Sequence, residues 1–330
     1  MNVGNLAVSE LKIGYDNGVK LIAHIPKIAT EAGALYALIG KNGCGKSTLL
    51  RTLGGLQKQL AGDIWYNGAS ISQLSAIDLA KEVAVVTTDR PQMGYASVFD
   101  VVASGRFPHL GKYGRLKTKD YEVIHGALKT VHLFDKKDEV FEKLSDGQAQ
   151  KVMLAKALAQ ETPFILLDEP MAFLDLPSKM ELSQTLLDLC EHHGKTVIMS
   201  THDLDLAMAT ATELWLLDEG VLTQGVPEEL ALNGVLANTF NRGQVQFDDG
   251  TGRFEFFKER KAFFKADISS HPKCKFWLHK AMNRLGWFEQ SSKAKLRISY
   301  EASNWVVDDN KKTHHFSTLA ALVNFIKKIP

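Results

Sequence analysis

Two short segments carry residue types and spacings that could act on a phosphate group. The first, GKNGCGKSTLL at residues 40–50, matches the pattern G-x-x-x-x-G-K-[ST] at every fixed position. Glycines at 40 and 45 let backbone N–H groups turn toward a phosphate. Lys46 would supply a positive charge, and the Ser47 hydroxyl a ligand for Mg²⁺. An apolar run precedes the loop and a helix begins within it, which is the context that a phosphate-binding loop requires.

The second segment is FILLDEP at residues 164–170, an apolar run that ends in two carboxylates. A buried strand would hold Asp168 at its end, where the carboxylate can face Mg²⁺ on the phosphates. Glu169 is placed to orient and deprotonate a water that attacks the γ-phosphate. Alone, such a run is more often an ordinary strand terminus. With the phosphate loop it predicts a phosphate-cleaving site, and GTPases, kinases, helicases and transport ATPases all remain open.

A third segment, LSDGQ at residues 144–148, separates these classes. Ser145 is well suited to cap a following helix, and Gly147 would present unobstructed N–H groups to an anion. Here the chain resembles the ATP-binding cassette (ABC) ATPase family, whose signature is L-S-G-G-Q. The order and spacing of phosphate loop, signature and acidic strand all match, over roughly residues 1–240.

The resemblance implies ATP and Mg²⁺ as ligands and a pair of cassettes facing each other head to tail. Each ATP would be held by the phosphate loop of one copy and the signature of the other, in a homodimer. It also implies that Tyr15 stacks on adenine, that His202 senses the γ-phosphate and that Asp175 signals across the dimer. The residues expected to contact ATP or Mg²⁺ or to act in hydrolysis are Tyr15, Gly40, Asn42, Gly43, Gly45, Lys46, Ser47, Thr48, Ser145, Gly147, Gln148, Asp168, Glu169, Asp175 and His202.

The chain departs from the family pattern at two positions. Asp146 stands where the signature has a glycine, and a carboxylate pointing at phosphate would be unfavourable, so we expect it to face away. The family also has a glutamine after the third strand that binds Mg²⁺ and water. Ungapped matching puts Thr88 there, with Asp89 or Gln92 as possible substitutes.

The elements that must position these residues read as an α/β fold. Apolar runs at 34–40, 82–88, 164–170, 195–201 and 213–220 alternate with helix-like stretches such as 145–160 and 177–192. This pattern predicts a mostly parallel sheet between helices. The first 30 residues and 61–68 look like antiparallel strands, and 90–160 looks like a helical insertion. The cassette is expected to span 1–257.

Residues 258–330 are expected to form a separate basic α+β module. They hold 15 Lys and Arg against 6 Asp and Glu, a net charge of +9, while the other 257 residues carry −8. A hairpin at 245–257 and a basic link at 258–265 precede a helix at 272–288. Strands at 295–300 and 303–307 and a helix at 317–328 follow. An amphipathic helix of this kind usually packs on a core. The basic charge also fits anionic lipid headgroups, or a regulatory site.

Composition and resemblance narrow the biological setting. Three scattered cysteines and 45% hydrophobic residues are typical of a cytosolic globular protein, and no apolar run approaches bilayer length. The segment 97–111 resembles importers of iron-siderophores, haem and cobalamin. We therefore expect a peripheral subunit on the cytoplasmic face of the cell membrane, working with two permease subunits and, indirectly, an external binding protein. No nucleic-acid-binding module is recognised. A soluble ABC ATPase and a weakly hydrolysing nucleotide sensor remain alternatives.

Overall fold

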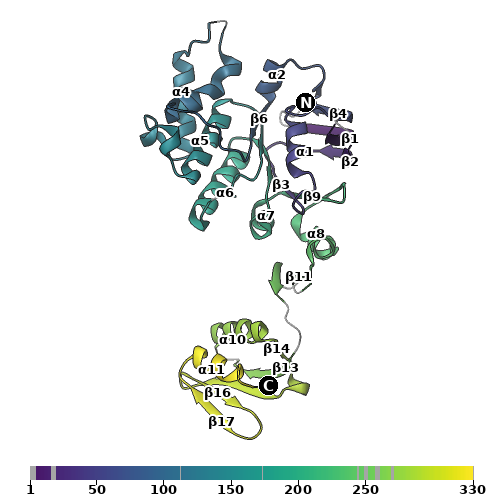
Figure 1. Ribbon diagram of the computed structural model, residues 1–330, viewed down its shortest axis with the longest axis vertical. Helices are drawn as coiled ribbons and strands as arrows, with labels where there is room; N and C mark the ends of the chain where they lie inside the picture. Colours follow the sequence, from purple (N-terminus) through teal and green to yellow (C-terminus); the bar gives the residue numbers. More distant parts are fainter. Residues whose placement is uncertain are drawn as a thin grey trace. The chain divides into compact units, whose positions relative to one another are not determined.

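The computed structural model describes residues 5–15, 20–111, 113–172, 174–243, 245–248, 252–256, 261–268 and 271–329. The chain divides into two compact units, with the boundary between Asn233 and Gly234 (Figure 1). The first unit contains every residue that the sequence points to as part of an ATP site. No helix in the described ranges has both the length and the apolar character needed to cross a bilayer.

A six-stranded sheet forms the centre of the first unit. Its order is β10-β9-β3-β8-β7-β6, and all neighbouring pairs are parallel except β9 and β10. Every residue of β3, β7 and β8 is buried, which explains their largely apolar sequences. The predicted parallel sheet is confirmed. The strands are β3 (Leu35–Ile39), β6 (Val83–Val86), β7 (Phe164–Leu167), β8 (Thr196–Ser200), β9 (Glu213–Asp218) and β10 (Val221–Gly225).

A smaller antiparallel sheet, in the order β2-β1-β4-β5, packs on the same core. Helix α1 (Lys46–Leu53) begins inside the phosphate loop. Its Leu49, Leu50 and Leu53 belong to one apolar cluster with residues of both sheets, so α1 is fixed from two sides. The antiparallel strands, predicted from the first 30 residues and 61–68, are β1 (Leu6–Tyr15), β2 (Lys20–Ala29), β4 (Ala61–Tyr66) and β5 (Ala69–Ser70).

Between β6 and β7 the described chain forms helices and turns and no named strand, as expected for the helical insertion. A buried ion pair between Arg106 and Asp120, at 2.9 Å, ties its segments together. The helices here are α3 (Val98–Ala103), α4 (Thr118–Thr130) and α5 (Asp146–Ala159); α2 (Ala76–Glu82) lies just before β6. The remaining helices of the unit are α6 (Leu176–Glu191), α7 (Leu204–Thr210) and α8 (Pro227–Leu232).

The second unit contains a five-stranded sheet with its own apolar core. The order is β14-β13-β15-β16-β17, with β13 parallel to both neighbours and the last three strands antiparallel. Helices α10 and α11 contribute Leu278, Met282 and Leu322 to that core. The elements are β13 (Ala262–Asp267), α10 (Pro272–Leu285), β14 (Trp287–Glu289), β15 (Leu296–Glu301), β16 (Asn304–Asp308), β17 (Thr313–Phe316) and α11 (Leu319–Ile326).

Two expectations for this part of the chain need correction. The unit begins at Gly234 rather than at 258, because α9 (Val235–Phe240) packs with the hairpin strands β11 (Val245–Asp248) and β12 (Arg253–Phe256). The stretch 258–265, expected to be a basic link, overlaps β13, the strand between β14 and β15. In β13 the side chains alternate, and Ala262, Phe264 and Ala266 are buried. The Asp-Gly turn of the hairpin lies outside the described residues.

Candidate active site

A cleft of about 870 Å³ opens over the carboxyl ends of the parallel strands. Its floor is the phosphate loop, residues 42–48, and its walls come from Tyr15 of β1 and from β2. Three strand ends add the rest: Glu169 follows β7, His202 follows β8, and 219–220 follow β9. Ligands of open parallel sheets bind at this edge, because the strand ends and helix N-termini converge there.

Two glycines of the loop have no room for a side chain. Gly40 has φ +152°, and a Cβ there would lie 2.2 Å from the carbonyl oxygen of Leu217. Gly45 has φ +110°, and a Cβ there would lie 2.3 Å from the Cγ2 of Ile22. The loop therefore needs glycine at both positions, as its sequence pattern requires.

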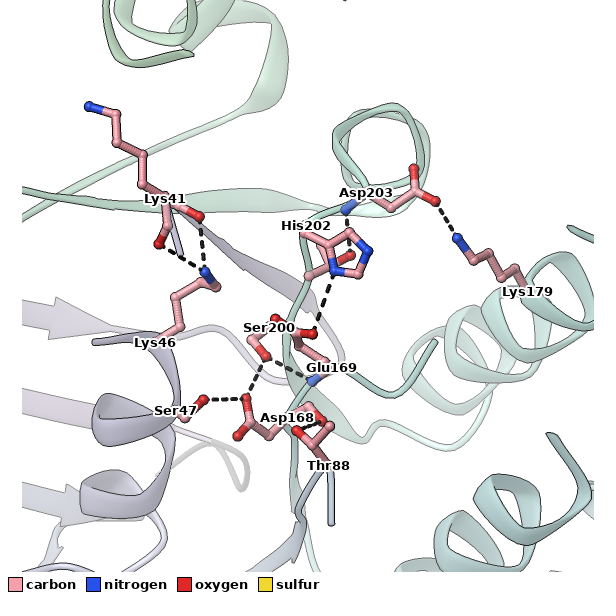
Figure 2. A network of polar contacts seen from close by, with 12 residues as sticks. Lys41, Lys46, Ser47, Thr88, Asp168, Glu169, Lys179, Ser200, His202 and Asp203 are labelled. Carbon is pink, nitrogen blue, oxygen red and sulfur yellow. Dashed lines mark hydrogen bonds and ion pairs between the residues drawn. The ribbon is translucent and has the colours of Figure 1, made fainter. Parts of the chain in front are cut away.

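Lys46 is buried with its ammonium group inside the loop. Its Nζ donates hydrogen bonds to the carbonyl oxygens of Gly40, at 2.9 Å, and Lys41, at 3.2 Å (Figure 2). A buried ammonium group is stable only with acceptors around it, and the loop carbonyls supply them. The charge is therefore held at the place where an anion would enter.

Asp168 is the centre of a polar network at the end of β7. Its Oδ1 accepts hydrogen bonds from the hydroxyls of Ser47, at 3.0 Å, and Ser200, at 2.8 Å. Ser200 Oγ also accepts from the backbone N–H of Glu169, at 2.8 Å (Figure 2). Sequence analysis missed Ser200. The available signal was its position as the polar last residue of a buried strand, two residues before His202.

Glu169 lies next to His202 at the mouth of this network. Its Oε2 is 3.5 Å from His202 Nδ1, and both side chains reach solvent. The backbone of Glu169 has φ +49°, a left-handed conformation that costs a non-glycine residue about 1–3 kcal/mol. The hydrogen bond from its N–H to Ser200 holds this conformation. At this position the Glu169 side chain lines the cleft.

Asp203 fixes the turn that carries His202. It caps α7 by accepting from the N–H of Leu206, at 3.2 Å, and it pairs with Lys179 at 2.9 Å. Partial burial raises the pKa of Asp203, but the hydrogen bonds from Lys179 and Leu206 outweigh it, so the pKa lies below its usual range. The carboxylate is thus charged at neutral pH.

Tyr15 is at the open side of the cleft. Its hydroxyl is 3.4 Å from Thr48 Oγ1, and 52% of the residue is exposed. A half-exposed aromatic ring whose hydroxyl is held at one end is available for stacking on a planar ligand.

The signature residues and Asp175 are held by local hydrogen bonds and do not line the cleft. Ser145 caps α5: its Oγ accepts from the N–H of Gln148, and Gln148 Oε1 accepts from the N–H of Ser145. Asp175 caps α6, and the hydrogen bonds it accepts from Ser178 lower its pKa. Within one copy, Ser145, Gly147, Gln148 and Asp175 therefore stand outside the cleft that contains the phosphate loop.

The candidates for the missing glutamine are also outside the cleft. Thr88 Oγ1 donates to the carbonyl oxygen of Asp168 at 3.0 Å, so it stabilises the backbone at the end of β7. Asp89 is almost fully exposed beside Arg51, and Gln92 is exposed. Asp146 accepts a hydrogen bond from Arg90 at 3.0 Å, which occupies the carboxylate that replaces the signature glycine.

Comparisons with known proteins agree with this geometry. Residues 26–172 match the family model described as ABC transporter. The chain is 35% identical to the iron(3+)-hydroxamate import ATP-binding protein FhuC of Bacillus subtilis (strain 168), covering 72% of this chain and 88% of that protein. It is 32% identical to the ferric enterobactin transport ATP-binding protein FepC of Escherichia coli (strain K12), covering 75% and 91%.

A solved structure of an ABC transporter is also similar to this chain. An ABC transporter in an inward-facing conformation, described as of the metal-chelate type, aligns with a TM-score of 0.60 and 30% identity, over 67% of this chain and 83% of the solved chain. The sequence motifs, the cleft and these relatives agree. The chain belongs to the ATP-binding proteins of the ABC transporter family, ATPases that couple ATP hydrolysis to transport.

Proposed function

We propose that this chain is the ATP-hydrolysing subunit of a membrane importer for iron–siderophore complexes or related metal chelates such as haem or cobalamin. Its named relatives import iron(3+)-hydroxamate and transport ferric enterobactin, and the aligned structure is of the metal-chelate type. The subunit would act as a homodimer on the cytoplasmic face of the cell membrane. It would dock onto two permease subunits, which receive cargo from an external binding protein.

ATP would occupy the cleft with its phosphates on the loop. Lys46 would contact the β- and γ-phosphates, the backbone N–H groups of residues 42–48 would surround them, and Tyr15 would stack on the adenine. Thr48 would support the Tyr15 hydroxyl, which is 3.4 Å away. The cleft volume of about 870 Å³ falls within the usual range for small-molecule sites.

The residues around Asp168 fit a magnesium ion. The Ser47 hydroxyl and the Asp168 carboxylate are oxygen donors 3.0 Å apart, and Mg²⁺ in nucleotide sites takes one or two such ligands plus phosphate oxygens and water. When bound, Mg²⁺ would neutralise charge on the phosphates. Ser200 would orient Asp168 from the other side, through the hydrogen bond at 2.8 Å.

Glu169 would act as the general base for hydrolysis. Its carboxylate lines the cleft, where it would hold a water in line with the γ-phosphate and accept its proton. His202, 3.5 Å away, would orient this carboxylate and donate to the γ-phosphate. Ser200 links Asp168 to the Glu169 N–H, so the acidic pair is preorganised as one unit.

A second copy would complete the site. Ser145, Gly147 and Gln148 form a capped helix N-terminus outside their own cleft, which suits them to bind the γ-phosphate held by the partner. ATP would thus join two copies, and hydrolysis would release them. Asp175, at the N-terminus of α6, would report nucleotide state to the other half of the dimer.

The observation that carries this proposal is the contact of Ser47 and Ser200 with Asp168, next to Glu169 in the same cleft as Lys46 (Figure 2). The purified chain should hydrolyse ATP, and Glu169→Gln should abolish turnover while ATP still drives dimerisation, measured by sedimentation. A chain that binds ATP without turnover would instead be a nucleotide sensor. The absence of the family's glutamine from the cleft is the feature that favours that second candidate.

A separate experiment tests the cargo. After reconstitution with the permease, a ferric siderophore together with its binding protein should stimulate ATP hydrolysis.

A further inference from the structure

The two departures from the family pattern are connected to each other in the structure. Asp146 replaces a signature glycine, and Thr88 occupies the position of the glutamine. Arg90, two residues after Thr88, donates from Nη1 to Asp146 Oδ1 at 3.0 Å. The segment that has Thr88 at the glutamine position is therefore bound directly, through Arg90, to the altered signature.

Arg90 also holds the peptide that leads into the signature. Its Nη2 donates to the carbonyl oxygens of Phe141, at 3.0 Å, and Leu144, at 3.3 Å. The guanidinium lies 5.2 Å from the centre of the Phe141 ring. Leu144 directly precedes Ser145, the cap of α5, so these contacts fix the backbone on the N-terminal side of the signature. Only the planar guanidinium, with donors in a rigid fork, can make all of these contacts together.

At its other end the same segment is attached to the acidic strand end. Thr88 Oγ1 donates to the carbonyl oxygen of Asp168 at 3.0 Å. Residues 88–90 therefore connect the end of β7 to the start of α5 through hydrogen bonds at both ends. Asp146, at the first position of α5, is also stabilised by the helix dipole, so its charge is tolerated there.

We propose that Arg90 is a positioning residue that sets the signature turn, residues 145–148, relative to the acidic end of β7. It acts through its ion pair with Asp146 and its bonds to Phe141 and Leu144, and it does not touch ATP. The proposal rests on the proposed function, in which the signature binds ATP on the partner copy. Loss of Arg90 then impairs formation of the shared site while leaving the phosphate loop of each copy intact.

The test is steady-state ATP turnover together with binding of a fluorescent ATP analogue. We expect Arg90→Ala to lower kcat about 10-fold, because a small misplacement of the signature weakens transition-state contacts. Analogue binding should change less than about 2-fold, since Arg90 is outside the cleft. Arg90→Lys, which keeps the charge, should restore part of the loss. Arg115→Ala is the matched control, because Arg115 is an exposed arginine outside residues 88–90. It should leave kcat unchanged.

A double-mutant cycle with Asp146→Gly, which restores the family residue, sharpens the test. In that background Arg90→Ala should cost clearly less than in the natural chain, because part of its role is the ion pair. Additive losses, an unchanged kcat in Arg90→Ala, or parallel losses of kcat, analogue binding and melting temperature would overturn the proposal. A natural chain that binds the analogue but neither turns over ATP nor dimerises would count against the proposed function instead.

A different observation concerns α10 of the second unit. One face of this helix packs into the core through Leu278, Ala281 and Met282. The other face exposes Phe276 and Trp277, at 53% and 61%, with their rings 5.2 Å apart. Exposed basic side chains flank them at helical spacing, at Lys273, Lys280 and Arg284.

The charge around this aromatic pair is mainly basic, and one carboxylate, Glu289, pairs with Lys275 and His279 of α10. Lys280 Nζ lies 5.9 Å from the Phe276 ring, and the sequence of α10 contains no carboxylate. Residues 258–330 have a net charge of +9. Two adjacent exposed aromatic rings in water are unfavourable, and rings of this kind are enriched where a protein contacts the membrane interface.

We infer that the exposed face of α10, defined by Lys273, Phe276, Trp277, Lys280 and Arg284, binds an anionic phospholipid surface. The rings enter the headgroup boundary and the basic groups pair with lipid phosphates. Charge complementarity favours this partner over a neutral surface, and the aromatic pair favours it over a nucleic acid backbone, which would need only the basic groups.

Vesicle flotation of the full chain tests this inference. Binding should require phosphatidylglycerol, at about 30% in phosphatidylcholine, since each basic group near the surface contributes about 1 kcal/mol. Lys273→Ala/Lys280→Ala should weaken binding about 30-fold by that figure. Lys311→Ala/Lys312→Ala removes the same charge from exposed positions after β16 and should have little effect. Trp277→Ala should weaken binding about 10-fold. Equal losses for both lysine pairs, binding without phosphatidylglycerol, or preference for an oligonucleotide would overturn it.

Discussion

The two units of this chain bury different kinds of residue. In the first, Lys46, Asp168 and Ser200 are buried next to a strained Glu169. In the second, the described buried residues are almost all apolar, with Trp287 and Trp305 among the largest, and Thr239 is the polar exception. Burying polar groups is costly unless they are fully hydrogen-bonded, whereas apolar burial stabilises any fold. The buried polar groups therefore mark a functional site in the first unit. The apolar core of the second unit serves to stabilise its fold.

The difference also shows where to look for the activity of each unit. The first unit keeps its chemistry inside a cleft, in hydrogen bonds between strand ends that are far apart in sequence. The second unit has its unusual feature on the outside, where Phe276 and Trp277 are exposed. Substitutions in the first unit should therefore change ATP turnover, and substitutions in the core of the second unit should change only its stability.

Lys46→Ala should have the largest effect. Removing the ammonium group from the loop should lower ATP turnover about 100- to 1,000-fold, because it removes the charge aimed at the phosphates. Lys41→Ala is the matched control: its side chain points to Asp218 at 3.1 Å, and only its backbone carbonyl contacts Lys46. Turnover in Lys41→Ala should stay near the natural level. Equal losses of turnover in the two variants would show that any positive charge near the cleft serves equally well. Lys46 would then have no special role in the site.

Trp305→Ala should destabilise the second unit alone. Trp305 is buried in β16 against Tyr300, with ring centres 4.8 Å apart, and its truncation should cost about 3–5 kcal/mol. Calorimetry should show one transition shifted down while ATP turnover stays within about 2-fold. Trp277→Ala, the exposed tryptophan of the same unit, should leave both transitions in place. Loss of turnover in Trp305→Ala would mean that the cassette depends on this unit for folding.

Ser200→Ala should reduce catalysis moderately. The change removes the hydrogen bond to Asp168 and the acceptor for the Glu169 N–H, so kcat should fall about 10-fold with ATP binding retained. Ser183→Ala is the control, because Ser183 is also buried but donates to the Lys179 carbonyl within α6. A Ser200→Ala chain with natural kcat would show that the polar network around Asp168 is not needed for hydrolysis.

Asp203→Asn should have the smallest effect, and it depends on pH. The native contacts lower the Asp203 pKa, so its stabilisation is complete above the unfolded pKa of about 3.9 and is lost as pH falls through the folded value. Asparagine still caps α7, so only the charge pairing with Lys179 is removed. At neutral pH the variant should be less stable by about 0.5–1 kcal/mol. At pH values well below the folded pKa of Asp203 the two chains should melt alike. A stability difference that stays constant with pH would assign the effect to the helix cap instead.

Much of the site could be predicted from sequence because each motif follows a buried strand. Parallel strands end at one edge of the sheet, so Lys46, Asp168, Glu169 and His202 were expected to be close together, and they line or adjoin one cleft. Arg90 was not expected, because its bond to Asp146 spans 56 residues and no spacing rule connects a loop to the start of a distant helix.

The fold of the second unit was less predictable than that of the first. Strand β13 is short and mixes Phe263 and Phe264 with Lys265 and Asp267, and its strand character depends on pairing with β14 and β15 on either side. Such pairing is tertiary, and local composition does not encode it. The boundary at Gly234 likewise depends on α9 packing against the β11–β12 hairpin.

Mixing two inactive variants tests the shared site most directly. Lys46→Ala lacks the phosphate loop's charge but keeps its signature, and Ser145→Arg blocks the signature but keeps its loop. Each should be nearly inactive alone. A mixture that exchanges subunits should regain about a quarter of natural turnover, since half the dimers then carry one intact site of two. A mixture no more active than its components would contradict a site formed between two copies.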